Sequence, residues 1–323
     1  MDVRLLAVLP LIAIPYVLAR AEYALVDLFL LVCLASLWNL PAGYAGLTSF
    51  GQQAYLGTGA YALYLFAAAG IDPAFGVVLA ALTAAIVALP VSLVVLRLNA
   101  GYFAVATWVV AEVLRLFVTL SPRVGGNTGV SLPGTGRYPL VLWQAITYWW
   151  SLGLMTACVG GVYLLMRSRF GLRARAVAAD PVAAAATGVA VGRVRRIAYL
   201  LSALGTGAVG AVLFCHHLYA APASVFGPQY SVAMLFMVLI GGLGTIEGPI
   251  LGALLYFGLQ QLLAGYGPWY LVVLGTVAML VTLFAPRGLC GGPAARRASL
   301  FPISSRYGPS RVRRNARPRG SSP

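Results

Sequence analysis

The stretch RSRFGLRARAVAADPVAAAATGVAVGRVRR, residues 167–196, interrupts a chain that otherwise consists largely of long apolar runs. It carries seven arginines and a single acid. Arginine-rich loops of membrane proteins stay on the cytoplasmic side, so a basic loop between two apolar runs sets the orientation of the spans around it. The stretch therefore predicts a membrane protein whose central loop is cytoplasmic.

The composition supports a membrane protein. Of 323 residues, 61% are hydrophobic and 9% are charged, which leaves too little polar surface to enclose the chain in water. The net charge of +15 would suit nucleic acid, but most arginines lie in the central loop or at and after Arg287, so we expect no nucleic-acid partner. Lysine is absent from the sequence, which excludes a Walker A phosphate loop because that motif needs its lysine. Any ATP-driven work therefore belongs to another chain.

Ten apolar segments approach the roughly 20 residues that a membrane-spanning helix needs. They predict an all-α polytopic membrane protein with about ten spans, some of them interrupted by glycine. The segments lie near residues 5–19, 23–40, 52–69, 74–96, 102–120, 142–166, 197–218, 230–243, 249–264 and 268–285. With the central loop inside, alternation places both termini in the cytoplasm and leaves only three arginines outside, as the positive-inside rule requires.

The two ends of the chain depart from this pattern of spans. The first segment also resembles a secretory signal with a cleavage site near Ala19, but apolar sequence resumes at Tyr23, so we favour an uncleaved span. Past Leu289 the sequence turns to Gly, Pro, Ser and Arg. It predicts a membrane domain over residues 1–290 and a disordered basic tail over residues 291–323. The tail either binds anionic lipid or is an extension without a partner.

Two stretches, residues 39–59 and 241–252, place glycines and polar side chains within apolar sequence. Irregular backbone at membrane depth persists only where protein buries it or where it lines a water-filled cavity, and a pair of broken segments points to a transport pathway. Close helix packing is the alternative for the glycines alone. The polar residues among them favour a lined cavity: Asn39, Thr48, Ser49, Gln52, Gln53 and Glu247.

Four ionisable residues lie inside predicted spans, namely Asp27, Glu112, Arg115 and Glu247. Such residues are costly in lipid, so we expect each to be paired or functional. Glu112 and Arg115 stand three positions apart on one helix and can neutralise each other. Asp27 has no obvious partner in sequence and must face the interior of the bundle.

No motif in the sequence indicates catalysis. The adjacent His216 and His217 do not share a helix face, so we expect them to be solvated at the membrane interface rather than to chelate a metal. The four cysteines lack the spacing of metal ligands or of a disulfide framework. With no nucleophile beside a base and no carboxylate pair, we expect neither an enzyme nor a metal site.

The central loop itself contains the start and stop signals of a short helix. Asp180 is a favourable N-cap, Pro181 suits the first helical position, and Gly188 supplies a left-handed stop. A helix of under two turns is unstable alone in water, so it needs a protein surface to hold it. The arginines around it could simply anchor the neighbouring spans at lipid headgroups, which explains the charge but not the capped helix.

Several stretches together carry a resemblance to a known family. They are residues 39–61 (NLPAGYAGLTSFGQQAYLGTGAY), 101–116 (GYFAVATWVVAEVLRL), 125–129 (GGNTG), 167–213, 240–253 (IGGLGTIEGPILGA) and 284–289 (FAPRGL). In order and spacing they resemble the LivM-type permease subunit of branched-chain amino-acid ABC importers. The resemblance implies a type II-like importer permease in the cytoplasmic membrane that binds no cofactor itself.

The same resemblance implies the partners and the role of the central loop. Partners would be two ATP-binding cassette subunits, which bind the ATP, a second LivH-like permease, and an extracytoplasmic substrate-binding protein. The loop would couple the ATPase to the membrane domain. The residues implied in this coupling are Arg173, Arg175, Asp180, Pro181, Ala184, Ala185 and Gly188. The sequence departs from the family pattern at Pro181, where an acidic residue is usual, and after Gly188.

The sequence indicates the substrate and the pathway less directly than it indicates the family. Related permeases import urea, amides or sugars, and a path with few fixed charges fits a zwitterion or a neutral solute. The residues that we expect to line the pathway are Asn39, Tyr44, Ser49, Gln52, Tyr55, Thr107, Glu112 and Glu247. An ion-coupled secondary transporter is one rival, with Asp27 as its candidate ion-binding acid. A membrane assembly or sensor protein that does not transport is the other.

Overall fold

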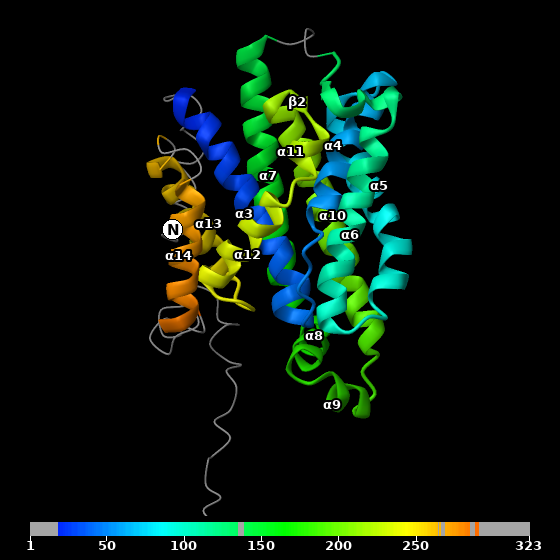
Figure 1. The fold of residues 1–323 in the computed structure, drawn as a ribbon, viewed down its shortest axis with the longest axis vertical. Coiled ribbons are helices and arrows are strands. Elements are labelled where there is room, and N and C mark those ends of the chain that lie inside the picture. The colour runs from blue at the N-terminus through cyan, green and yellow to red at the C-terminus, as the bar shows by residue number, and fades with distance from the viewer. Residues whose placement is uncertain (1–18, 135–138, 264, 266–268, 285–287, 291–323) are drawn as a thin grey trace, which may run out of the picture.

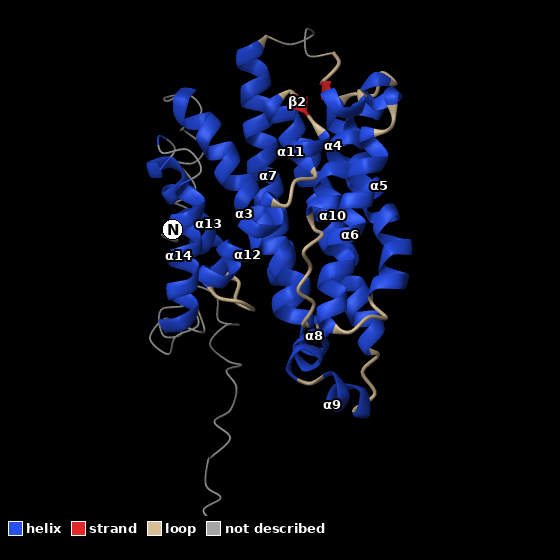
Figure 2. Cartoon of the chain, in the orientation of Figure 1, coloured by secondary structure: helices blue, strands red, loops and turns tan. Residues whose placement is uncertain are grey.

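Helices make up almost all the regular structure of the computed structural model (Figures 1 and 2). It describes residues 19–134, 139–263, 265, 269–284 and 288–290, so the first predicted span and the predicted tail lie outside the described residues. The helices are α3 (Ala19–Ala45), α4 (Gln53–Ala68), α5 (Pro73–Val95), α6 (Ala100–Thr119), α7 (Leu140–Arg167), α8 (Arg169–Ala179), α9 (Pro181–Ala186), α10 (Val191–His217), α11 (Pro222–Val225), α12 (Gln229–Gly241), α13 (Glu247–Leu263) and α14 (Trp269–Phe284).

The predicted spans from the second to the tenth are confirmed as helices. Six helical stretches are long and apolar enough to cross a membrane, and they correspond to α3, α5, α6, α7, α10 and the pair α11 and α12. The helices α4, α13 and α14, of 16 or 17 residues, match the predicted segments 52–69, 249–264 and 268–285. The all-α polytopic prediction therefore stands for the described part of the chain.

Helices α3 and α10 form the centre of the bundle. Their apolar windows are 67% and 78% buried, whereas the window of α6 is only 17% buried. Small residues allow the close contacts of α10: a Cβ on Gly210 would lie 1.9 Å from the carbonyl oxygen of Leu56, and one on Gly59 would lie 2.0 Å from that of Gly207. Membrane helices gain packing contacts where small residues let their backbones approach. These glycines therefore serve helix packing.

The bundle has two distinct ends (Figure 1). One end carries the central loop, residues 167–196, and we call it the loop end. There, α8 and α9 project beyond the long helices. At the opposite end lie short 3₁₀ turns, η1 (Pro122–Val124) and η2 (Gly126–Thr128), together with the two-residue strands β1 (Val130–Ser131) and β2 (Tyr219–Ala220). The strands pair antiparallel.

The broken segments are shorter than the sequence indicated. Helix α3 continues through Asn39 and Pro41 to Ala45, so the irregular part of the first stretch covers residues 46–52. In the second stretch α12 ends at Gly241 and α13 begins at Glu247. The expected interruption near Asn39 was placed too early, because an internal proline removes one backbone donor without ending the helix.

Replacing Gly210 with Val should destabilise the bundle, because the added side chain meets the backbone of α4. Overpacking of this kind costs about 1–3 kcal/mol. The free energy of unfolding in denaturant, measured on purified protein, checks the effect. Gly153→Val on α7 is the matched control, since a Cβ there meets nothing within 4 Å. Equal stability of the two variants would contradict the packing role of α10.

Candidate functional site

The short helix predicted in the central loop is present as α9. The Asp180 carboxylate accepts hydrogen bonds from the backbone N–H groups of Val182 and Ala183, at 2.8 and 3.1 Å. Pro181 occupies the first turn, and Gly188 has the left-handed φ of +85° that a helix stop favours. The start and stop signals therefore form the local structure that they predicted, while the coupling role of these residues stays a prediction.

Helix α8 was missed by sequence reasoning. Ser168 caps it by accepting from the N–H of Phe170 at 3.1 Å, and its buried residues, Gly171, Ala174 and Val177, recur at helical spacing. Ser168 and the spacing of the three small or apolar residues are signals of a helix, although the arginines among them make the stretch look like a charged loop. The loop is therefore two consecutive helices, with α8 packed on α3 and α7.

An apolar cluster fixes both loop helices to the membrane helices. It joins Ala174 and Val177 of α8 and Ala184 of α9 to Tyr44 near the end of α3 and to Ile246 beside α13. Ala184 is 4% exposed and so belongs to the core, whereas its neighbour Ala185 is exposed. Of the residues expected to contact an ATPase, Ala184 thus faces its own subunit.

Two predicted arginines of α8 lie in different surroundings. Arg173 is exposed, and Arg175 is half-buried with its guanidinium carbon 5.9 Å from the centre of the Tyr44 ring. This distance is within reach of a cation–π interaction. Arg175 therefore ties α8 to α3, while Arg173 is available at the surface.

The two glycine-rich stretches of the sequence meet at the loop end. Asn39 Nδ2 donates to the carbonyl oxygen of Thr245 at 2.7 Å, and the N–H of Gly244 donates to Asn39 Oδ1 at 2.9 Å. A Cβ on Gly43, one turn further along α3, would lie 2.5 Å from the nitrogen of Gly244. More than 200 positions separate these partners, so no local pattern could have paired them.

The remaining predicted pathway residues of the first stretch are buried in contacts within the subunit. Gln52 donates to the hydroxyls of Ser202 and Thr206 on α10, and the hydroxyl oxygens of Tyr55 and Tyr199 lie 2.6 Å apart. The six residues Asn39, Tyr44, Ser49, Gln52, Tyr55 and Thr107 are each at most 2% exposed. Ser49, Gln52 and Thr107 hold the irregular residues 46–52, Asn39 binds the second irregular segment, and Tyr44 and Tyr55 contact Arg175 and Tyr199. The role of all six in lining a pathway stays a prediction.

Thr107 and Ser49 brace the same segment through the backbone. The N–H of Phe50 donates to Thr107 Oγ1 at 3.2 Å, and Trp38 Nε1 donates to the carbonyl oxygen of Ser49 at 2.8 Å. Gln53, which the pathway set omitted, accepts from the Ser231 hydroxyl of α12. The first irregular segment is therefore bound to α3, α6 and α10 by polar contacts, and the start of α4 is bound to α12.

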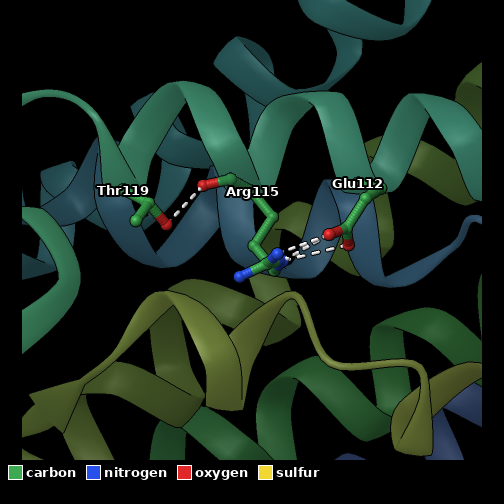
Figure 3. A network of polar contacts seen from close by, with 3 residues as sticks. All are labelled: Glu112, Arg115 and Thr119. Carbon is green, nitrogen blue, oxygen red and sulfur yellow. Dashed lines mark hydrogen bonds and ion pairs between the residues drawn. The ribbon is translucent and has the colours of Figure 1, made fainter.

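Glu112 and Arg115 form the predicted pair on α6 (Figure 3). Arg115 Nε donates to both carboxylate oxygens, at 3.0 and 2.9 Å, and Nη2 donates to one of them. The Glu112 side chain is 46% exposed. Beside it, between α6 and α12, lies a groove of about 340 Å³ lined by Trp108, Val232 and other mostly apolar residues. The pair therefore lies on an outward face of the subunit.

Asp27 has partners that the sequence did not reveal. One of its carboxylate oxygens lies 3.5 Å from His216 Nε2 and 3.8 Å from His217 Nε2. The expectation that both histidines are solvated is wrong for His216, whose side chain is 6% exposed, because Tyr23 lies over it with 4.0 Å between ring centres. Asp27 also lines a cavity of about 320 Å³, which also reaches Tyr230 and Gln260.

Glu247 begins α13, directly after the irregular residues 242–246. A carboxylate at a helix start is favoured by the exposed N–H groups there. Glu247 is therefore at the loop end, beside the Asn39 contacts. Within the described residues, no group of three or more His, Cys, Asp or Glu side chains is arranged to hold a metal ion.

The chain is similar to proteins of one transport family. A model of the family described as "Branched-chain amino acid transport system / permease component" matches residues 20–283. The high-affinity branched-chain amino acid transport system permease protein LivM of Escherichia coli (strain K12) is 24% identical over 311 residues, and that of Salmonella typhimurium (strain LT2) is 23% identical. Each match covers 86% of this chain and 72% of the relative. No solved structure matches the chain.

Removing the carboxylate of Asp180 should loosen α9, because two backbone N–H groups lose their acceptor. The loss of such a cap costs about 1 kcal/mol, which corresponds to roughly fivefold faster amide exchange. Hydrogen exchange over residues 181–187 of Asp180→Ala measures it. Asp72→Ala, which removes the equivalent cap of α5, is the control and should leave α9 unchanged. Unchanged exchange in Asp180→Ala would refute the cap.

Proposed function

Since the chain belongs to the family of permease components of branched-chain amino acid transport systems, we propose that it is the membrane-spanning permease subunit of an ABC importer. It passes branched-chain amino acids across the cytoplasmic membrane, and partner subunits bind and hydrolyse the ATP. The observation that carries the proposal is the capped helix α9, which projects with α8 from the loop end (Figure 1).

The docking surface for an ATP-binding cassette subunit is the outer side of α8 and α9. Val182 on α9 is 79% exposed and Leu172 on α8 is 55% exposed, and Arg173 lies on the same pair of helices. A short basic loop in the cytoplasm has no lipid to cover these apolar side chains. Exposed apolar residues beside a cation are typical of a protein interface. On the opposite side, Ala184 and Arg175 anchor the two helices to the rest of the subunit.

A second permease would cover the outward face of α6. Val105 and Trp108 are 58% and 52% exposed there, and the Glu112–Arg115 pair lies further along the same side of the helix. An ion pair in contact with lipid is costly, whereas an interface between two permeases provides water and polar partners along a solute path. We place the pathway along this face, with Glu112 exposed to it and the buried polar residues of the first irregular segment behind it.

The orientation follows from the arginines. The loop end carries the basic loop and is cytoplasmic in this proposal. The opposite end, with η1, η2 and the paired strands, then faces the extracytoplasmic substrate-binding protein. A multi-pass membrane protein with both termini in the cytoplasm results.

Replacing Val182 with Asp tests the ATPase docking surface. A carboxylate buried against a partner without a counter-charge weakens association strongly, so the ATP-binding subunit recovered with the tagged permease should fall by more than about tenfold. Leu120→Asp is the control, because Leu120 is 78% exposed at the opposite end of the molecule. Equal recovery of the ATPase with both variants would contradict docking at α9.

Cysteine substitution followed by a membrane-impermeant thiol reagent tests the pathway. We expect Glu112→Cys to react in the resting complex, because that side chain is already half exposed. Ser49→Cys should react only while the complex hydrolyses ATP, because Ser49 is buried in the resting subunit. Inaccessibility of both positions in all states of the cycle would refute the assignment.

A further inference from the structure

The irregular residues 242–246 between α12 and α13, which we call the break, are held by one side chain from a distant helix. The carboxamide of Asn39 both donates to Thr245 O and accepts from Gly244 N–H. No hydrocarbon environment could satisfy these two backbone groups, so Asn39 supplies what water would supply in a loop. Removing the carboxamide leaves both groups without this partner.

The break is also tightly folded on itself. The Thr245 hydroxyl donates to the carbonyl oxygen of Gly242 at 2.8 Å and accepts from the N–H of Gly248 at 3.0 Å. Gly242 and Gly244 have φ values of +127° and +73°, a region that side-chain-bearing residues rarely adopt. Residues 242–245 of the break therefore hold their shape through polar contacts and glycine geometry.

A short segment after α14, residues 288–290, closes the other side of the break, and we call it the strap. The N–H groups of Leu289 and Cys290 donate to the carbonyl oxygens of Ile240 and Gly241, at 3.0 and 2.9 Å. A Cβ on Gly288 would lie 2.4 Å from the Cα of Gly242. The strap thus satisfies the last carbonyls of α12, which have no partner in the next turn because the helix ends there.

The break and the loop helices are in direct contact. Ile246, its last residue, is 5% exposed and packs in the same cluster as Val177 of α8 and Ala184 of α9. The ring of Tyr44, five residues beyond Asn39 on α3, lies under the guanidinium of Arg175. A displacement of α8 and α9 therefore acts on both sides of the Asn39 clamp, on Ile246 and on the end of α3.

We propose that Asn39 is a positioning residue of the transport cycle: it clamps the break to α3, and movement of α8 and α9 releases the break and the strap together. This inference rests on the proposed function. Its physical basis is that the clamp and the centre of the bundle are held together by different kinds of interaction. The centre of α3 and α10 is close-packed, whereas the clamp consists of two hydrogen bonds at the loop end, which water can replace when that end opens. The loop end can thus open while the centre stays intact.

Cys290 gives a native probe of the clamped state. Its thiol lies in the strap and is half-buried, and burial, with a smaller contribution from the negative charge of Glu247, raises its pKa. The thiolate is the reactive form, so a seated strap keeps Cys290 slow to react near neutral pH, and release of the strap lowers the pKa and speeds the reaction.

The experiment compares Asn39→Ala, Asn39→Asp and Ser36→Ala. Ser36 is the matched control, since it lies one turn earlier on α3, is 5% exposed, and its hydroxyl has no hydrogen-bond partner among the described residues. The first readout is the rate at which a polar maleimide labels Cys290 in membranes that contain this permease without its ATPase. We expect about a tenfold increase in Asn39→Ala, because two hydrogen bonds are lost. Cys290→Ser gives the background rate.

The aspartate variant separates the two hydrogen bonds. Its carboxylate still accepts from Gly244 N–H but cannot donate to Thr245 O, so its labelling rate should lie between those of the wild type and Asn39→Ala. Wild-type rates in both Asn39 variants, or an equal increase in Ser36→Ala, would overturn the clamp.

The second readout is the number of leucine molecules transported per ATP hydrolysed by the assembled complex. Asn39→Ala should lower this ratio severalfold while the amount of assembled complex stays the same. A ratio equal to that of the wild type, with only less complex formed, would show a merely structural residue and overturn the positioning role. Failure of the wild-type chain to bind any ATPase would contradict the proposed function instead, and the labelling experiment would still decide the clamp.

Discussion

A helix that breaks within a membrane must find protein partners for the backbone groups that it exposes, because hydrocarbon offers none. In this chain that constraint is met between the break and Asn39, whose carboxamide binds Gly244 and Thr245. The contact joins the second half of the bundle to α3, its central helix. The strap, the loop helices and the start of α13 are all arranged around it.

The same constraint explains the polar residues that look out of place in an apolar chain. Gln52, Tyr55 and Thr107 contact the irregular residues 46–52 or anchor the start of α4. Polar side chains at membrane depth are costly unless they have polar partners or face water, and the sequence alone favours a transport pathway as the explanation. The contacts of Gln52 and Thr107 show that support of the irregular segment is one such reason.

Local signals predicted local structure well. Hydrophobic run length predicted nine described helices, and Asp180, Pro181 and Gly188 predicted α9, because capping and left-handed turns depend on a few adjacent residues. Helix α8 was missed although Ser168 and the spacing of Gly171, Ala174 and Val177 were present. The contacts of Asn39 with Gly244 and of Asp27 with His216 join residues almost 200 positions or more apart. Packing alone creates such pairs, so no pattern within one segment reveals them.

We propose that this chain transports branched-chain amino acids only as part of an ATP-driven assembly. The most direct measurement is the uptake of radiolabelled leucine by proteoliposomes that contain the chain, its partner permease, the ATP-binding subunits and the substrate-binding protein. We expect uptake that requires ATP on the side of the loop end and stops when the ATP-binding subunits are omitted. Uptake by this chain alone, driven by an ion gradient without ATP, would contradict it.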